Sequence, residues 1–157
     1  MPLWKRAQLQ PRPNEIMSIL AIERICLAAH ADNKVEAIRQ AGALLVKTGC
    51  ITPEYVEGML SRERSMSTYL GNGVAIPHGE YDNRQHILQT GISVLQLPAG
   101  VEWEAGERVH LVIGIAASSD EHVGVLTRLA NVIEDEAALQ ILQDTRDPQV
   151  VFDTLTA

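Results

Sequence analysis

The feature that most restricts how this chain can fold is an apolar segment over residues 109–116, which reads Val-His-Leu-Val-Ile-Gly-Ile-Ala. A strand with one face in water alternates apolar and polar residues, whereas a strand buried on both faces is apolar nearly throughout. The segment therefore predicts a central strand covered on both faces. Strand-like and helix-like segments alternate along the rest of the 157 residues, which indicates one α/β domain with a sizeable core.

Local signals place further elements around this strand. Asn33-x-x-Glu36 has capping-box spacing at the start of a helix, and Gly49 suits the end of that helix. Thr52-Pro53 supplies the N-cap and first position of a second helix over 53–64. The remaining expectations are strands at 25–29, 74–76 and 90–97, a polar loop at 80–88, a turn-rich hairpin region at 98–107, and helices that open at Ser119, near 136 and at Asp147-Pro148.

Helical periodicity also predicts which residues of these helices face the core. In the first helix the apolar face contains Val35 and Ile38 together with residues 42, 45 and 46. In the helix that opens at Ser119, we expect the core-facing residues to be Val123, Leu126, Ala130 and Ile133.

The composition argues against several classes of protein. A net charge of −7 argues against non-specific nucleic-acid binding, which needs a basic surface. No apolar run reaches the about 18–20 residues that span a bilayer. Residues 1–15 are basic and are not followed by a long apolar run, so we expect a flexible leader and not a signal peptide. Cys26 and Cys50 lack metal-ligand spacing and are interpreted as reduced cysteines of a cytoplasmic protein.

His78 is the strongest candidate for chemistry. It follows the short strand 74–76, and Pro77 has a fixed φ that also keeps Ile76 extended, so the direction of the chain into His78 is set. Gly79 permits a turn, or a close approach of another molecule, directly beside the ring. A histidine held this way suits a nucleophile that other molecules must reach.

The other four histidines do not suggest a metal site. No two histidines have the i, i+4 spacing of a helical metal site. His30 is expected at the surface, His86 in the polar loop and His110 at a strand end. His122 falls in the first turn of the helix that opens at Ser119, where free N–H groups and the helix dipole favour an anion and the neutral imidazole.

Arg62 and Arg64 close the second helix. A cation at a helix C-terminus is an ordinary match to the helix dipole. From the residues alone, both this structural role and a ligand-binding role stay open for each arginine.

The chain resembles a known family at these same positions. Leu70-Gly71-x-x-Val74-Ala75-Ile76-Pro77-His78-Gly79, with Glu63 upstream, resembles the active-site signature of type-2 enzyme IIA domains. These domains belong to the bacterial phosphoenolpyruvate:sugar phosphotransferase system (PTS). Tyr55-Val56-x-Gly58-Met59-Leu60 and Glu121-His122 are similar to the mannitol branch. The similarity covers residues 16–157, so we expect one EIIA type-2 domain after a leader at 1–15.

The resemblance implies a fold and a phosphotransferase activity. The fold is a mixed central β-sheet flanked by helices on both faces. The activity is that of a phosphocarrier, in which His78 accepts a phosphoryl group from phospho-HPr, with Nε2 as the family's reacting atom. The group then passes to a cysteine of a sugar-specific IIB domain, of the mannitol or fructose type, for mannitol-type sugar uptake. Arg62 would stabilise the phosphoryl charge and His122 would donate a hydrogen bond to it, without a cofactor or a metal.

Many mannitol permeases fuse this domain to membrane IIC and IIB parts, which this chain does not contain. We therefore expect a free-standing cytoplasmic component that meets the membrane only through the permease, and no nucleic-acid partner. One rival interpretation is a phosphorylation-dependent regulatory EIIA protein of the nitrogen-related branch. The other is a histidine-dependent hydrolase or metalloenzyme, but neither Gly-x-Ser-x-Gly nor His-Glu-x-x-His occurs.

Overall fold

The computed structural model describes residues 18–157, with the side chains of residues 119 and 120 excepted, so the expected leader at 1–15 lies outside the described part. Within these residues the centre is a five-stranded sheet with the strand order β1-β4-β5-β3-β2. Its long pair, β4 and β5, is antiparallel, while β1 runs parallel to β4 and β3 runs parallel to β5. The expected mixed sheet is therefore confirmed. The strands are β1 (Ile25–Cys26), β2 (Tyr69–Gly71), β3 (Val74–Ala75), β4 (Gly91–Glu104) and β5 (Glu107–Ala116).

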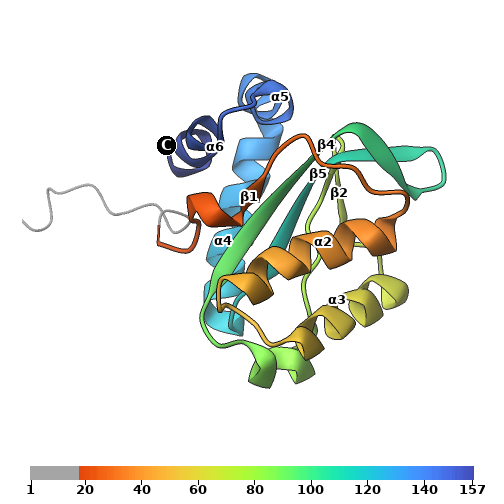
Figure 1. Cartoon of the computed structure of the whole chain (residues 1–157), viewed down its shortest axis with the longest axis vertical. Helices are drawn as coiled ribbons and strands as arrows, with labels where there is room; N and C mark the ends of the chain where they lie inside the picture. Colours follow the sequence, from red (N-terminus) through yellow and green to blue (C-terminus); the bar gives the residue numbers. More distant parts are fainter. Residues whose placement is uncertain (1–17) are drawn as a thin grey trace, which may run out of the picture.

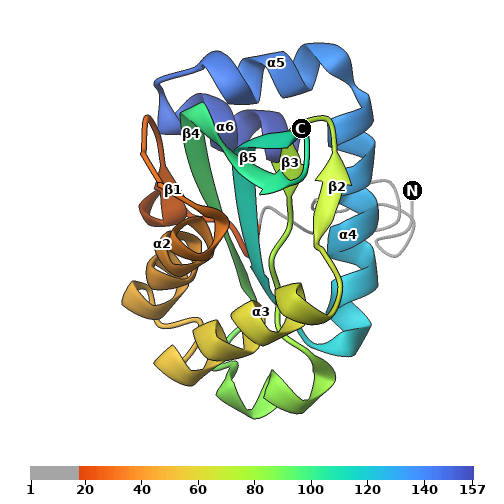
Figure 2. The same ribbon diagram turned by 90° about the vertical axis from the view of Figure 1, so that its right-hand side faces the viewer.

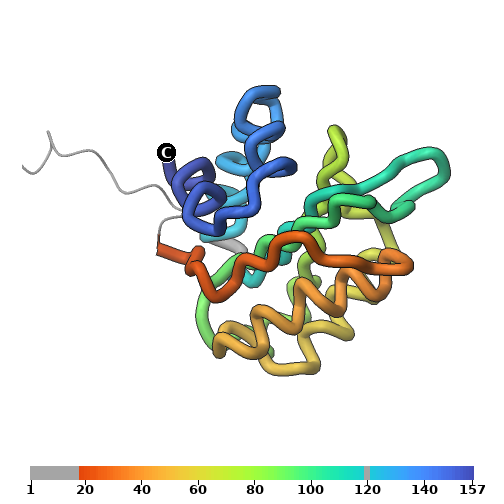
Figure 3. Tube along the Cα trace, turned by 45° about the horizontal axis from the view of Figure 1, so that its top comes forward, coloured from red at the N-terminus to blue at the C-terminus, as the bar shows by residue number. Residues whose placement is uncertain are grey.

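Helices cover both faces of this sheet, as expected (Figures 1 and 2). One face is covered by α2 (Lys34–Lys47) and α3 (Pro53–Ser65), and the other by α4 (Ser119–Glu134), α5 (Glu136–Asp144) and α6 (Pro148–Thr156). Figure 3 shows the same separation, with α2 and α3 on one side of the strands and the three C-terminal helices on the other. The described chain also contains two short 3-10 helices. η1 (Ile22–Arg24) precedes β1, and η2 (Tyr81–His86) lies between β3 and β4 in the sequence.

The apolar segment 109–116 explains this three-layer arrangement. Successive residues of a strand point to opposite faces. Val112 accordingly belongs to the apolar cluster beneath α2 and α3, whereas Leu111, Ile113 and Ile115 belong to the cluster beneath α4, α5 and α6. All four side chains are fully buried, and each such burial stabilises the fold by roughly 1.5–3 kcal/mol. The predicted two-sided burial of this strand is confirmed.

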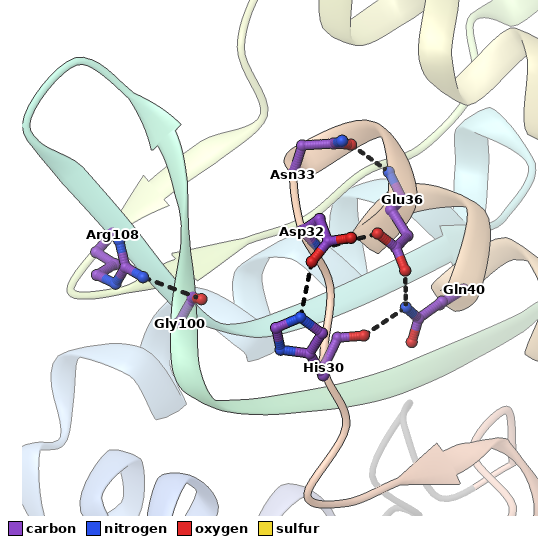
Figure 4. A network of polar contacts seen from close by, with 7 residues as sticks. All are labelled: His30, Asp32, Asn33, Glu36, Gln40, Gly100 and Arg108. Atoms are coloured by element: carbon purple, nitrogen blue, oxygen red, sulfur yellow. Dashed lines mark hydrogen bonds and ion pairs between the residues drawn. The ribbon is translucent and has the colours of Figure 1, made fainter.

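The start of α2 forms as its capping signal predicts (Figure 4). The Asn33 side chain accepts a hydrogen bond from the Glu36 N–H at 2.9 Å, and Glu36 accepts one from the Asp32 N–H at 2.8 Å. Gln40 extends this network to the His30 carbonyl at 2.7 Å. The bond from the Glu36 N–H satisfies a donor that a helix start leaves free, and the other two hold the chain before the helix against its first turns.

Several strand boundaries differ from the prediction. The first strand ends at Cys26 because the Gln96 side chain accepts the Ala28 N–H at 3.0 Å, and Ala28 takes a φ of 52°. The expected hairpin at 98–107 is present, but its turn comprises only residues 105–106. Most of the range continues the strands, since β4 runs to Glu104 across a register shift between Gln96 and Val101. Pro98 lies in this irregular stretch, where its missing N–H does not interrupt regular pairing. Arg108 donates to two carbonyls of this irregular stretch. The distance is 3.0 Å to Ala99 and 3.4 Å to Gly100, and Figure 4 shows the second bond.

One strand was not predicted, and one loop needs correction. The strand β2 turns into β3 through positive φ values at Gly71, Asn72 and Gly73. The polar loop at 80–88 contains η2.

The predicted core faces of two helices are partly wrong. Val35 and Val123 are exposed, at 46% and 66%. The buried residues of α4 are Val125, Leu129, Val132 and Ile133, which form an equally regular helical stripe. The predicted stripe and the observed stripe of α4 are similarly apolar, and packing against the sheet determines which residues are buried. Across residues 18–157, no helix combines the length and the apolar character that crossing a bilayer requires.

Candidate functional site

The backbone on both sides of His78 is held by the sheet. Residue 78 makes an isolated parallel bridge to Ile115 at the end of β5, and the Ile115 N–H donates to the Pro77 carbonyl at 2.9 Å. Just before it, the Ile76 N–H donates to the Thr68 carbonyl at 3.0 Å. Pro77 has no N–H to satisfy, so it fits this crossing from strand to loop without an unpaired donor. The predicted stiff connection into His78 is confirmed.

A short hydrogen bond orients the His78 ring. Nδ1 lies 2.7 Å from the Ile76 carbonyl oxygen. Because a carbonyl oxygen can only accept, we assign the proton of the neutral ring to Nδ1. Nε2 then carries the lone pair and is the nitrogen available for nucleophilic attack.

His122 lies beside His78, although 44 positions separate the two residues in the sequence. It occupies the first turn of α4, where its N–H donates to the Ser118 carbonyl at 2.8 Å. The two imidazoles meet edge to face, with ring centroids 4.8 Å apart and an interplanar angle of 61°. Both rings are half-buried.

Arg62 supplies a positive charge to the same site. It lies in the last turn of α3, and its Nη1 donates to the Met66 carbonyl, which holds the guanidinium back toward the end of its own helix. A guanidinium has five N–H donors, so this bond leaves further donors for an anion.

The three predicted site residues line one pocket with a volume of about 360 Å³. Its lining residues come from the loop after β3, from α3, from η2 and from the start of α4. Figure 2 shows that these elements lie at one end of the sheet. The full lining of the pocket comprises Tyr55, Arg62, His78, Gly79, Glu80, Tyr81, Arg84, Ile87, Ala117 and His122.

The electrostatics of the pocket favour neutral imidazoles. Burial lowers the pKa of His78, and Arg62 lowers it further, while the bond to the Ile76 carbonyl and the charge of Glu63 act in the opposite direction. Burial also lowers the pKa of His122, as do the neighbouring His78 and Arg62. Near neutral pH, one nitrogen of each ring is therefore a donor and the other an acceptor.

Glu63 supports the site from behind and does not line the pocket. Its buried carboxylate accepts hydrogen bonds from the Thr68 N–H at 2.9 Å, from the Thr68 hydroxyl, and from the Trp103 indole N–H at 2.8 Å. The Lys34 ammonium is 3.7 Å away. Since the Thr68 carbonyl in turn accepts the Ile76 N–H, Glu63 anchors the backbone that orients the His78 ring.

Tyr55, Tyr81 and Arg84 are among the lining residues that carried no role in the sequence-based prediction. Tyr55 is a polar residue on the buried face of α3, only 2% exposed, and a buried hydroxyl needs partners. Tyr81 and Arg84 lie on η2, where the Arg84 guanidinium stacks 3.8 Å above the Tyr81 ring. Tyr55 could have been noticed in the sequence, because a tyrosine on the buried face of a helix needs a partner for its hydroxyl. Tyr81 and Arg84 could not, because residues 80–88 are mostly polar and were expected to form a loop.

The remaining histidines lie outside this pocket. His30 pairs with Asp32 at 2.8 Å and is exposed, as predicted. His86 is half-buried at the end of η2. His110 lies inside β5 and not at a strand end as expected, because this strand begins at Glu107, and its Nδ1 is 3.2 Å from the Leu97 carbonyl of β4. In the described part of the chain, no three His, Cys, Asp or Glu side chains are grouped so that they could hold a metal ion.

Comparison with known proteins identifies close relatives. The family model described as "Phosphoenolpyruvate-dependent sugar phosphotransferase system, EIIA 2" matches residues 18–157. The chain is 48% identical over 124 residues to a multiphosphoryl transfer protein of Salmonella typhimurium, which covers 79% of the chain and 33% of that relative. It is 42% identical over 159 residues to the mannitol-specific EIICBA component of the PTS of Pasteurella multocida, which covers 99% of the chain and 26% of that relative. The chain thus spans about a third or less of the length of these curated relatives.

A solved structure shares most of the fold. It is described as a complex of enzyme IIAMTL and phosphorylated enzyme IIBMTL from Escherichia coli. The TM-score is 0.81 with 41% sequence identity, over 87% of this chain and 98% of that chain.

Proposed function

Since this chain belongs to the EIIA 2 family of the phosphoenolpyruvate-dependent sugar phosphotransferase system, we propose that it carries a phosphoryl group on Nε2 of His78. The donor is phospho-HPr, and the acceptor is a cysteine of a sugar-specific IIB domain. The observation that supports this most strongly is the shared pocket of His78, His122 and Arg62, in which the His78 lone pair lies on Nε2.

In the accepting step the Nε2 lone pair forms a bond to phosphorus while the bond from phosphorus to the donor breaks. The imidazole becomes positively charged as the new bond forms, and its Nδ1 proton stays in the hydrogen bond to the Ile76 carbonyl. That carbonyl and the nearby Glu63 charge, which both raise the pKa of His78, stabilise the cationic ring. Transfer to the acceptor cysteine reverses the step, and the ring returns to its neutral form.

Arg62 and His122 stabilise the transferred group. A phosphoryl group brings roughly two negative charges, and a planar guanidinium can contact two of its oxygens. The neutral His122 ring has one N–H to donate to a third oxygen. Phosphoryl transfer depends mainly on such positioning and charge stabilisation, so these two groups supply most of what the protein must add.

The relatives suggest the partners of this carrier. The solved relative was determined as a complex of the mannitol IIA enzyme with a phosphorylated IIB enzyme, and a matching relative is mannitol-specific. We therefore assign this chain to mannitol-type sugar uptake, in the cytoplasm, and favour this assignment over the nitrogen-related regulatory alternative.

The proposal is tested by intact mass after incubation with phosphoenolpyruvate, enzyme I and HPr. We expect one acid-labile phosphate on the wild type and none on His78→Ala. His30→Ala is the matched control, since it removes an exposed histidine outside the pocket, and it should be phosphorylated like the wild type. Phosphate uptake by His78→Ala would refute the assignment of the nucleophile.

A further inference from the structure

Tyr55 lines the same pocket as His78, and its hydroxyl bridges the residue after the histidine and the strand beside it. Its hydroxyl donates to the Ile115 carbonyl at 2.8 Å and accepts the Gly79 N–H at 2.9 Å. Both partners belong to segments that lie beside His78, although Tyr55 itself comes from α3.

These contacts complete a closed ring of hydrogen bonds around His78. In a parallel bridge between residues 78 and 115, one bond joins the Ile115 N–H to the Pro77 carbonyl, and a second would join the Gly79 N–H to the Ile115 carbonyl. The first bond is present at 2.9 Å. At the position of the second, the Tyr55 hydroxyl bonds both groups. The peptide groups before and after His78 are thus both tied to Ile115, one directly and one through the phenol.

Packing reinforces this arrangement. A Cβ atom added at Gly79 would lie 2.7 Å from Cε2 and 3.0 Å from Cζ of the Tyr55 ring. The close approach that Gly79 permits is therefore made by a residue of the same chain. Burial raises the pKa of Tyr55 to about 12, so the phenol keeps the proton that it donates to Ile115 under all physiological conditions.

We infer that Tyr55 is a positioning residue for His78: its hydroxyl ties the peptide group after the histidine to Ile115, the residue that also holds the peptide group before it, and thereby keeps the Nδ1–H on the Ile76 carbonyl and Nε2 available in the pocket. The consequence for phosphoryl transfer depends on the function proposed above, whereas the effect on the ring can be measured without any partner protein. A displacement of about 1 Å at a reacting atom can lower a rate on the order of a hundredfold.

The test compares Tyr55→Phe with Tyr69→Phe. Tyr69 is a matched control because its hydroxyl also bridges two groups, at 3.0 Å to Glu107 and 3.4 Å from the Gly73 N–H, but at the opposite end of β5. The first readout is the ¹⁵N spectrum of the His78 imidazole, which distinguishes the two neutral tautomers. The second is kcat and KM for phosphorylation by phospho-HPr.

In Tyr55→Phe we expect a mixture of His78 tautomers and a kcat about ten- to a hundredfold lower, with KM little changed. Tyr69→Phe should match the wild type in both readouts. If Tyr55→Phe is less stable but keeps a single Nδ1–H tautomer and a normal kcat, then Tyr55 has only a structural role and the inference is wrong.

A second variant keeps the test decisive if Tyr55→Phe does not fold. Gly79→Ala disturbs the same contact from the other side while the hydroxyl remains, and the inference predicts the same tautomer mixture. A single Nδ1–H tautomer in folded Gly79→Ala would overturn it. If the wild type itself takes up no phosphate, the proposed function fails, but the tautomer comparison still decides the role of Tyr55.

Discussion

The imidazole rings of His78 and His122 meet edge to face with their centroids 4.8 Å apart, at a place where burial lowers the pKa of both. One ring comes from the loop after β3 and the other from the first turn of α4. Two neutral rings can share this pocket, whereas two imidazolium ions beside Arg62 would repel each other. The arrangement therefore links the stability of the fold to pH.

Acid should destabilise the protein before most carboxylates titrate. An unfolded histidine binds its proton near pH 6.5, while the two folded rings, with lowered pKa values, still resist protonation. The unfolded state thus binds more protons, and the free energy of unfolding should fall as the pH drops below about 6.5. Urea unfolding between about pH 5 and pH 7.5 measures this fall. The double variant His78→Gln/His122→Gln should lose much of the dependence, and an equal slope in both proteins would contradict the prediction.

Substitution Arg62→Gln should raise the pKa of both pocket histidines. The positive charge of Arg62 is one of the causes that lower each of these pKa values. NMR titration of the imidazole C–H signals measures both values in one experiment. Arg64→Gln is the matched control, because Arg64 is an exposed arginine two positions further along the same helix and does not line the pocket. A fall in either pKa in Arg62→Gln would show that the charge assignment is wrong.

Substitution of Arg62 should also slow phosphoryl transfer. A charge-assisted hydrogen bond is worth about 1.5–3 kcal/mol, so its loss in the transition state should slow Arg62→Gln about ten- to a hundredfold. Arg62→Lys keeps the charge without the planar fork and should be intermediate. Rapid-quench measurement of phosphorylation by phospho-HPr gives these rates, with Arg64→Gln expected at the wild-type rate. Equal rates for Arg62→Gln and the wild type would remove Arg62 from the mechanism.

Substitution Glu63→Gln should destabilise the fold. The buried carboxylate accepts from two groups of Thr68 and from the Trp103 indole, and an amide can present only one oxygen to these donors. We expect a loss of about 2–3 kcal/mol in the free energy of unfolding, measured in urea. Glu57→Gln, which removes only the exposed pair with Arg39, should cost at most about 1 kcal/mol. Similar losses in the two variants would mean that the buried network contributes no more than a surface ion pair.

Substitution Gly114→Ala should overpack the centre of the sheet. A Cβ at this position of β5 would lie 2.6 Å from the Ser93 hydroxyl oxygen, which donates to the Ala41 carbonyl at 2.8 Å. We expect a loss of about 1–3 kcal/mol. The double variant Ser93→Ala/Gly114→Ala removes the clashing atom, so its loss in urea unfolding should be smaller than the sum of the single losses. Strict additivity would show that the two positions do not clash.

Local signals in the sequence predicted much of the fold. The apolar segment 109–116 indicated burial on both faces, and the capping residues Asn33 and Asp147 begin helices as their side chains suggest. These features depend on residues within a few positions of one another. The buried face of α4 was predicted only in part: Ile133 is buried as expected, but Val123 is exposed, and Val125 and Leu129 are buried instead. Which apolar residues of a helix are buried depends on its contact with the sheet, and the sequence of the helix alone does not specify that contact.

The candidate site shows the same division. His78 could be identified from its own neighbours, since Pro77 and Gly79 mark it locally. His122 and Arg62 each had an ordinary structural explanation, and the family resemblance made them candidates for the site. Tyr55 had no predicted role, because the partners of its hydroxyl lie 24 and 60 positions away.

The sequence by itself thus determined the α/β class, the helix starts and the stiff connection into His78, because periodicity, capping and proline geometry act over short stretches of chain. Only the tertiary structure decided that His122, Arg62 and Tyr55 meet around that histidine and that its proton lies on Nδ1. These contacts join segments that are far apart in the chain. They form only when helices cover both faces of the sheet, because this packing brings α3 and the start of α4 together at one end of the sheet.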